Sequence, residues 1–184
     1  MIAAMKNPNI DDITANDAVS IIGSIFRVRR DLLSLVKNNV IAGSGLTLEQ
    51  ADVLVDLYGA KELNWPDPKM IQGSGGWVTF GDLQKSVVNN SPELVTRRLS
   101  DLKQKKYVEI ARVTKAEARQ EGINAKSKKA RVLPEGSQTA KEILEKYGRV
   151  GHQLLHRLPP EKLQDARKAQ AFNEALMAAL RFGA

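Results

Sequence analysis

The chain of 184 residues contains no cysteine, and aromatic residues make up only 5% of it. Without cysteine it forms neither disulfides nor thiolate metal sites, and it has no cysteine nucleophile. So few aromatic side chains disfavour a protein that stacks single-stranded bases on aromatic platforms. No apolar run approaches the roughly 20 residues of a membrane-spanning helix, and the N-terminus lacks the apolar core of a secretory signal. We therefore expect a cytoplasmic protein without a membrane segment.

Positive charge is abundant but unevenly distributed. The formal net charge is +7 and the sequence pI is about 9.7. Residues 97–131 alone contain 12 lysines and arginines against four acidic residues, a formal +8, so the rest of the chain sums to −1. Concentrated positive charge indicates a polyanionic partner, which we expect to be nucleic acid, although an anionic membrane surface would also attract it.

The two ends of the chain are predicted to be helical. After a polar tail, 1–16, apolar side chains recur at helical spacing over 17–40. Two more amphipathic helices are predicted over 134–158 and up to about residue 182, separated by Pro159 and Pro160. These helices have more apolar surface than one small lobe can cover, which predicts self-association.

The middle of the chain contains several local signals for helix starts and loops. Thr47 and Gln50 have the spacing of a capping box and start a helix that we expect to end near Tyr58. Glycines and prolines predict a loop over 60–76, followed by a short strand at 77–79 and a helix to about residue 88. The glycine cluster in that loop lacks the lysine of a phosphate-binding loop, so a connector is favoured.

A second helix follows at once and leads into two strands. Ser91 is placed to cap it and Pro92 to occupy its first position, and the helix is expected to end near Leu102. An alternating strand over 107–113, a long charged loop and a short strand ending at 132–133 come next. This order is typical of a helix-turn-helix followed by a β-wing.

Two polar features admit more than one interpretation. Arg29 falls within the apolar arc of the first helix, so it needs a partner there. A salt bridge or a snorkelling side chain at a helix interface is favoured, and an anion-binding role in a ligand pocket is the alternative. His152 and His156 are four residues apart, as metal ligands can be, but a surface pair is favoured because no zinc-hydrolase motif accompanies them. No catalytic or dinucleotide-binding fingerprint is present, so we predict no enzyme, no metal and no cofactor.

Three patches resemble the MarR (multiple-antibiotic-resistance regulator) family over almost the whole chain. They are Leu-Thr-Leu-Glu-Gln-Ala-Asp-Val-Leu at 46–54, Val-Thr-Arg at 95–97 with Lys-Tyr-Val at 106–108, and Val-Leu-Pro-Glu-Gly at 132–136. The resemblance implies a mainly α protein with a small β-wing (α+β), in which 46–134 forms a winged helix-turn-helix lobe. It also implies that 17–45 and 135–184 form a helical dimerisation region.

The resemblance further implies a homodimer that binds a pseudo-palindromic operator in double-stranded DNA. Such regulators are usually repressors that a small anionic aromatic or phenolic molecule releases. For this effector the candidate residues are Arg29, Tyr58 and Trp65. From the expected packing of the recognition helix and from the charge of the wing, the candidate DNA-binding residues are Asn90, Ser91, Thr96, Arg97, Arg98, Lys126, Lys128, Lys129 and Arg131.

The chain departs from the family in its wing and in one loop. The Asp-x-Arg of the family's wing tip falls on Asn124-Ala125-Lys126, so neither signature residue is kept. Residues 114–122 resemble an insertion that is helical in character, and the loop 60–76 is long. The alternative function is a winged-helix architectural or nucleic-acid-binding protein that responds to no effector.

Overall fold

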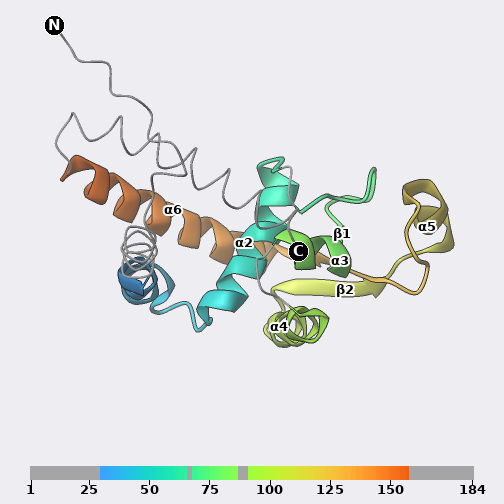
Figure 1. Ribbon diagram of the computed structural model, residues 1–184, viewed down its shortest axis with the longest axis horizontal. Helices are drawn as coiled ribbons and strands as arrows, with labels where there is room; N and C mark the ends of the chain where they lie inside the picture. The colour runs from blue at the N-terminus through green and yellow to red at the C-terminus, as the bar shows by residue number, and fades with distance from the viewer. Residues whose placement is uncertain (1–29, 66–67, 87–90, 158–184) are drawn as a thin grey trace, which may run out of the picture.

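The computed structural model describes residues 30–65, 68–86 and 91–157. The predicted N-terminal tail, most of the first predicted helix and the last predicted helix lie outside the described residues. Within the described part, helices surround a small antiparallel sheet (Figure 1). The predicted fold class, mainly α with a small β-wing, is confirmed.

The end of the first predicted helix has an irregular geometry. Residues 30–36 are α-helical and continue into a π-helical turn, η2 (Lys37–Ile41). Gly43 and Gly45 then adopt φ angles of +83° and +68°, which side chains with a Cβ rarely adopt. This turn reverses the chain, so Val40 and Ile41 are buried beside the next helix.

The central helix is α2 (Leu48–Glu62), and it begins where the sequence predicts. The Thr47 hydroxyl accepts the Gln50 N–H at 3.2 Å, while the Gln50 side chain accepts the Thr47 N–H at 3.1 Å. Its end is a correction, because α2 continues past Tyr58 to Glu62. Gly59 lies inside the helix, and the Trp65 ring occupies the space where a side chain at this position would lie.

The helix-turn-helix consists of α3 (Phe80–Ser86) and α4 (Pro92–Gln104), which pack on one another. The Thr79 hydroxyl accepts the Asp82 N–H at the start of α3, at 3.0 Å. The Ser91 hydroxyl accepts the Leu94 N–H at 3.3 Å, as the predicted cap of α4 requires. Both helix starts therefore follow from local sequence.

The wing consists of β2 (Val108–Arg112) and β3 (Lys128–Val132), and β1 (Val78–Thr79) pairs with the other edge of β3. All pairs are antiparallel, with Ile110 opposite Ala130 between β2 and β3. The insertion between the two wing strands is helical, as predicted, and forms α5 (Lys115–Glu121). Thr114 and Glu117 form its capping box, and Gly122 ends it with a φ of +66°.

The long helix α6 (Pro134–His156) crosses α2 and extends away from the wing (Figure 1). Its side chains join one hydrophobic core with α2, α4 and the sheet, in which Leu54, Leu99 and Ile143 are almost fully buried. Because α2 contacts α6, α4 and β3, it fixes the recognition helix relative to the long helix. Among the described helices, none combines the length and the apolar character that crossing a membrane requires.

Candidate DNA-binding interface

The helix α4 has one face in the core and one face in solvent. Val95, Leu99 and Leu102 are buried, whereas Arg97 is exposed and forms no ion pair within the described part of the chain. Thr96 is half-buried, and its hydroxyl donates to the Pro92 carbonyl at 2.8 Å. The exposed face is therefore free to enter a groove, with Arg97 as its central cation.

Arg98, one residue further, points elsewhere. It is half-buried and lies near two carboxylates of α2. The pKa of Glu49 is lowered chiefly by its backbone hydrogen bond and by Thr47, with Arg98 as a smaller cause, and the Arg98 charge opposes the shift of the Asp52 pKa. The net direction for Asp52 is nevertheless upward, because burial raises its pKa and Glu49 adds to that effect. Nearby, the Gln50 amide donates to the Asp101 carboxylate at 3.1 Å. Arg98 therefore belongs to the contact between α4 and α2, and we remove it from the proposed DNA contacts.

One exposed cation of the wing, Lys128, lies beside α4, and a second, Lys126, lies at the wing tip. Lys128 lines a hollow of about 270 Å³ between α3, α4 and β3, together with Thr96 and Gln84. Lys126 lies at the wing tip, where its N–H donates to the Asn124 side chain at 2.8 Å. Both lysines are exposed. Neither forms an ion pair within the described ranges, so their charges are available to phosphates.

Lys129 and Arg131 lie on the opposite face of the sheet, because side chains alternate along a strand. The Lys129 ammonium is 2.6 and 2.7 Å from the two carboxylate oxygens of Glu117, and the residue is only 5% exposed. Arg131 forms a 2.7 Å ion pair with Glu109. Both cations also lie 4.7 Å from the ring centroid of Trp77. Lys129 does not fit the predicted DNA contact, and Arg131 is engaged within the sheet.

Glu117 therefore holds the inserted helix against the wing. Its pKa is below its usual range, chiefly because Lys129 donates to the carboxylate and secondarily because the Thr114 N–H does so. Glu117 and Trp77 hold the two wing cations in place, and the sequence alone does not single them out. The Thr114–Glu117 capping spacing signals the start of α5, but no local pattern indicates that Lys129 is the partner.

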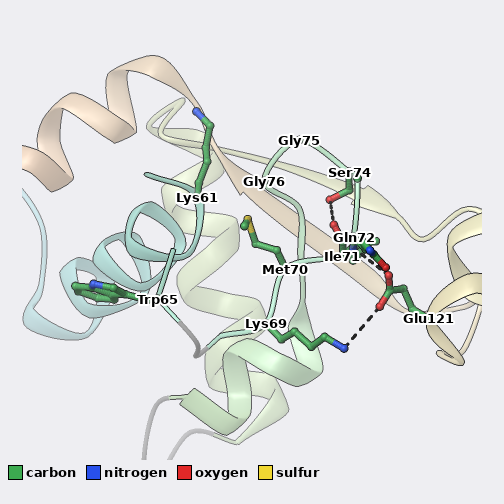
Figure 2. A pocket seen from close by; sticks show the side chains of 11 residues that line it. Lys61, Trp65, Lys69, Met70, Ile71, Gln72, Ser74, Gly75, Gly76 and Glu121 are labelled. Atoms are coloured by element: carbon green, nitrogen blue, oxygen red, sulfur yellow. Dashed lines mark hydrogen bonds and ion pairs between the residues drawn. The ribbon is translucent and has the colours of Figure 1, made fainter. Parts of the chain in front are cut away.

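The other predicted site residues are spread over different places. Asn90 and Arg29 lie outside the described residues. Ser91 is exposed at the start of α4, near the proposed DNA-facing surface. Tyr58 is half-buried against the core, whereas Trp65 lines a cavity of about 640 Å³ that Tyr58 does not line. In the described part of the chain, this cavity (Figure 2) therefore does not join the two aromatic residues.

The histidine pair lies on the surface of α6. The Nε2 atoms of His152 and His156 are 3.1 Å apart, and both side chains are exposed. Over the described ranges there is no group of three or more histidine and acidic side chains that could hold a metal ion. The surface-pair interpretation stays a prediction.

No protein-family model matches the sequence, and no curated protein matches it in sequence. Several solved structures are similar to it in fold. BpsR of Bordetella bronchiseptica, whose DNA binding is regulated by 6-hydroxynicotinic acid, is 17% identical, with a TM-score of 0.57. That match covers 85% of this chain and 98% of BpsR.

Two further structures match at a similar level. MepR of S. aureus in complex with DNA is 15% identical, with a TM-score of 0.60, and the match covers 83% of this chain and 96% of MepR. The organohalide-sensing transcriptional regulator RdhR-CbdbA1625, bound to 2,4-dichlorophenol, is 14% identical, with a TM-score of 0.64. That match covers 98% of this chain and 92% of the regulator. These likenesses confirm the predicted winged helix-turn-helix fold.

Proposed function

We propose that this protein is a transcriptional regulator of the MarR type that binds double-stranded DNA in a sequence-specific manner. The observation that carries the proposal is the exposed face of α4. Arg97 lies at its centre, and Lys128 flanks it across the hollow shared with Thr96. The same fold binds DNA in MepR. The proposal involves no catalysis, and it implies a cytoplasmic protein that acts on chromosomal DNA.

In this proposal α4 enters the major groove, which is about 12 Å wide and accepts one α-helix. Arg97 has the planar guanidinium that can donate two hydrogen bonds to a guanine edge, and Ser91 and Thr96 are placed for backbone or base contacts. Lys126 and Lys128 then approach the phosphates beside that groove. Phosphate contacts set the position of the protein, whereas the α4 contacts supply the sequence preference.

We propose that the protein acts as a homodimer on a pseudo-palindromic operator. Leu32 and Leu33 are 47% and 40% exposed on the first helix, and Leu154 is 36% exposed near the end of α6. Large apolar side chains on the same two helices that the sequence predicts to dimerise support burial against a second copy. A two-fold dimer would place two copies of α4 about one turn of DNA apart.

The proposal includes release from DNA by a small aromatic or carboxylate effector, which makes the protein a repressor. Its support is the fold shared with BpsR and RdhR-CbdbA1625, which are regulated by or bound to 6-hydroxynicotinic acid and 2,4-dichlorophenol. Arg29 stays the candidate partner of an effector carboxylate between the dimerisation helices and the DNA-binding lobe.

The test is fluorescence anisotropy with DNA from the region upstream of the protein's own gene, at one fixed salt concentration. We expect specific binding to exceed binding to shuffled DNA by about 10³-fold or more. Arg97→Ala should weaken specific binding by about 1–3 kcal/mol, whereas Lys141→Ala, an exposed α6 lysine, should leave it unchanged. Equal affinity for both DNAs would support the architectural alternative. An Arg97→Ala variant that binds the specific DNA as tightly as the wild type would show that Arg97 is not part of the interface.

A further inference from the structure

Gln50 is a buried polar residue at the contact between α2 and α4, and it is only 9% exposed. Its side-chain oxygen accepts the N–H of Thr47 at 3.1 Å, and its side-chain nitrogen donates to the Asp101 carboxylate at 3.1 Å. Thr47 caps α2, whereas Asp101 lies in the last turn of α4. The side chain therefore connects the start of α2 with the recognition helix beside it (Figure 1).

The two partners of this side chain require a glutamine. The Thr47 N–H only donates, so it faces the amide oxygen, and an ionised carboxylate only accepts, so Asp101 faces the amide nitrogen. A capping box by itself is satisfied by glutamate as well as by glutamine. What glutamine adds over glutamate at this position is therefore the hydrogen bond to Asp101.

The position of Asp101 on α4 explains why that bond bears on DNA binding. Asp101 follows Arg97 by four residues, the spacing at which opposite charges on a helix pair. Arg97 is nevertheless exposed and without an ion pair among the described residues, while the half-buried Asp101 is bound to Gln50 of α2. A carboxylate released by Gln50 would swing towards solvent, where it would reach Arg97 and face the DNA phosphates.

We propose that Gln50 is a positioning residue for DNA recognition, which holds the Asp101 carboxylate against α2 and so leaves Arg97 unpaired on the DNA-facing side of α4. The inference rests on the proposed function, because it concerns the same DNA-binding face. Gln50 touches no DNA and acts through Asp101. An arginine engaged by a neighbouring carboxylate has fewer N–H groups to donate to a base, and a negative charge turned towards DNA opposes binding.

Two variants separate this role from the helix cap. Gln50→Glu keeps an acceptor for the Thr47 N–H but sets a second carboxylate against Asp101. The double variant Gln50→Glu/Asp101→Asn exchanges donor and acceptor, since the new amide can donate to the new carboxylate. It also has the net charge of the wild type, so its affinity for DNA can be compared directly.

The measured quantity is the affinity for DNA from upstream of the protein's own gene divided by the affinity for shuffled DNA, at one salt concentration. An unfolded fraction lowers both affinities by the same factor, so a loss of stability alone does not move this ratio. Gln50→Glu should lower the ratio by about fivefold to tenfold, and the double variant should restore it to within about twofold. Gln104→Glu, the same change at an exposed position of α4, controls for the added charge and should leave the ratio within about twofold.

A double-mutant cycle with Arg97 tests whether Gln50 acts through that arginine. In the wild type Arg97→Ala should lower the ratio by about fivefold or more. In the Gln50→Glu background the same change should lower it by less than about threefold, because Arg97 is already engaged. The inference is overturned if Gln50→Glu keeps the wild-type ratio, if the double variant does not restore it, or if Arg97→Ala costs as much in both backgrounds.

Hydrogen exchange without DNA separates the failure of this inference from the failure of the proposed function. Exchange over 101–105, the end of α4, should rise in Gln50→Glu and return to the wild-type level in the double variant. A wild type that does not prefer its own upstream DNA overturns the proposed function, and unchanged exchange in Gln50→Glu then overturns the hold of Gln50 on Asp101 as well. A wild type with that preference and an unchanged ratio in Gln50→Glu overturns this inference alone.

Discussion

The ion pair between Glu117 and Lys129 provides a quantitative test of how the wing is built. Lys129 is 5% exposed, and the side chain of Glu117 is 19% exposed. Glu117→Gln leaves the ammonium in a buried position without an anion, and breaking a buried pair from one side costs about 3–5 kcal/mol. The Trp77 ring still faces the ammonium, and α5 lies at the surface, so we expect a loss of about 2 kcal/mol of unfolding free energy, below that range.

The opposite replacement should cost less. In Lys129→Met the Glu117 carboxylate keeps the Thr114 N–H at 2.8 Å and is closer to solvent than the ammonium was. We expect a loss of about 1 kcal/mol, and the double variant should be close to Lys129→Met alone, because no unpaired buried charge remains. The asymmetry between the two single variants follows from the deeper burial of the lysine.

Urea unfolding followed by far-ultraviolet circular dichroism measures these differences. Glu142→Gln, on the exposed side of α6, is the control, and we expect it within about 0.5 kcal/mol of the wild type. Equal stability of Glu117→Gln and this control, or a larger loss in Lys129→Met than in Glu117→Gln, would contradict a buried ion pair that holds α5 on the wing.

Two further predictions concern pH and glycine. The pKa of Glu117 is below its usual range because of Lys129 and the Thr114 N–H, so its ionised form stabilises the fold above the unfolded pKa of about 4.3. This contribution is lost as pH falls through the lower folded pKa, and the stability gap between the wild type and Glu117→Gln should shrink in acid; a gap that grows in acid would contradict the assignment. Gly136→Ala would place a Cβ onto the Tyr107 carbonyl oxygen and should cost about 1–3 kcal/mol in urea unfolding. In Gly148→Ala the new Cβ meets nothing within 4 Å, so this variant should instead raise the unfolding free energy by up to about 1 kcal/mol. A change of the same sign in both glycine variants would contradict this expectation.

Local signals made most of the fold predictable. The starts of α2, α4 and α5 each depend on a side chain that caps its own first turn, so a few consecutive residues contain the information. The end of α2 at Glu62 differs from the predicted end near Tyr58 for the opposite reason. Gly59 and the residues after it favour a break in the sequence, but the Trp65 ring covers the glycine once the chain folds back.

The candidate site was less predictable, because it depends on contacts between distant segments. Alternation along β3 implies that Lys128 and Lys129 face opposite sides, but it does not say which side belongs to the proposed DNA-binding face. The answer comes from the hollow that Lys128 lines with residues of α3 and α4 on one face, and from Trp77 and α5 on the other. Arg98 is a similar case, since only the position of α2 shows that it faces carboxylates.

The pairing of Lys129 and Arg131 with carboxylates also bears on the salt dependence that the proposed DNA binding would have. Association frees one condensed counterion for nearly every phosphate that a protein cation neutralises. A lysine or arginine that is already held by Glu117 or Glu109 frees none. The basic segment would therefore release fewer counterions than its 12 lysines and arginines imply, because Lys129 and Arg131 hold the wing together instead.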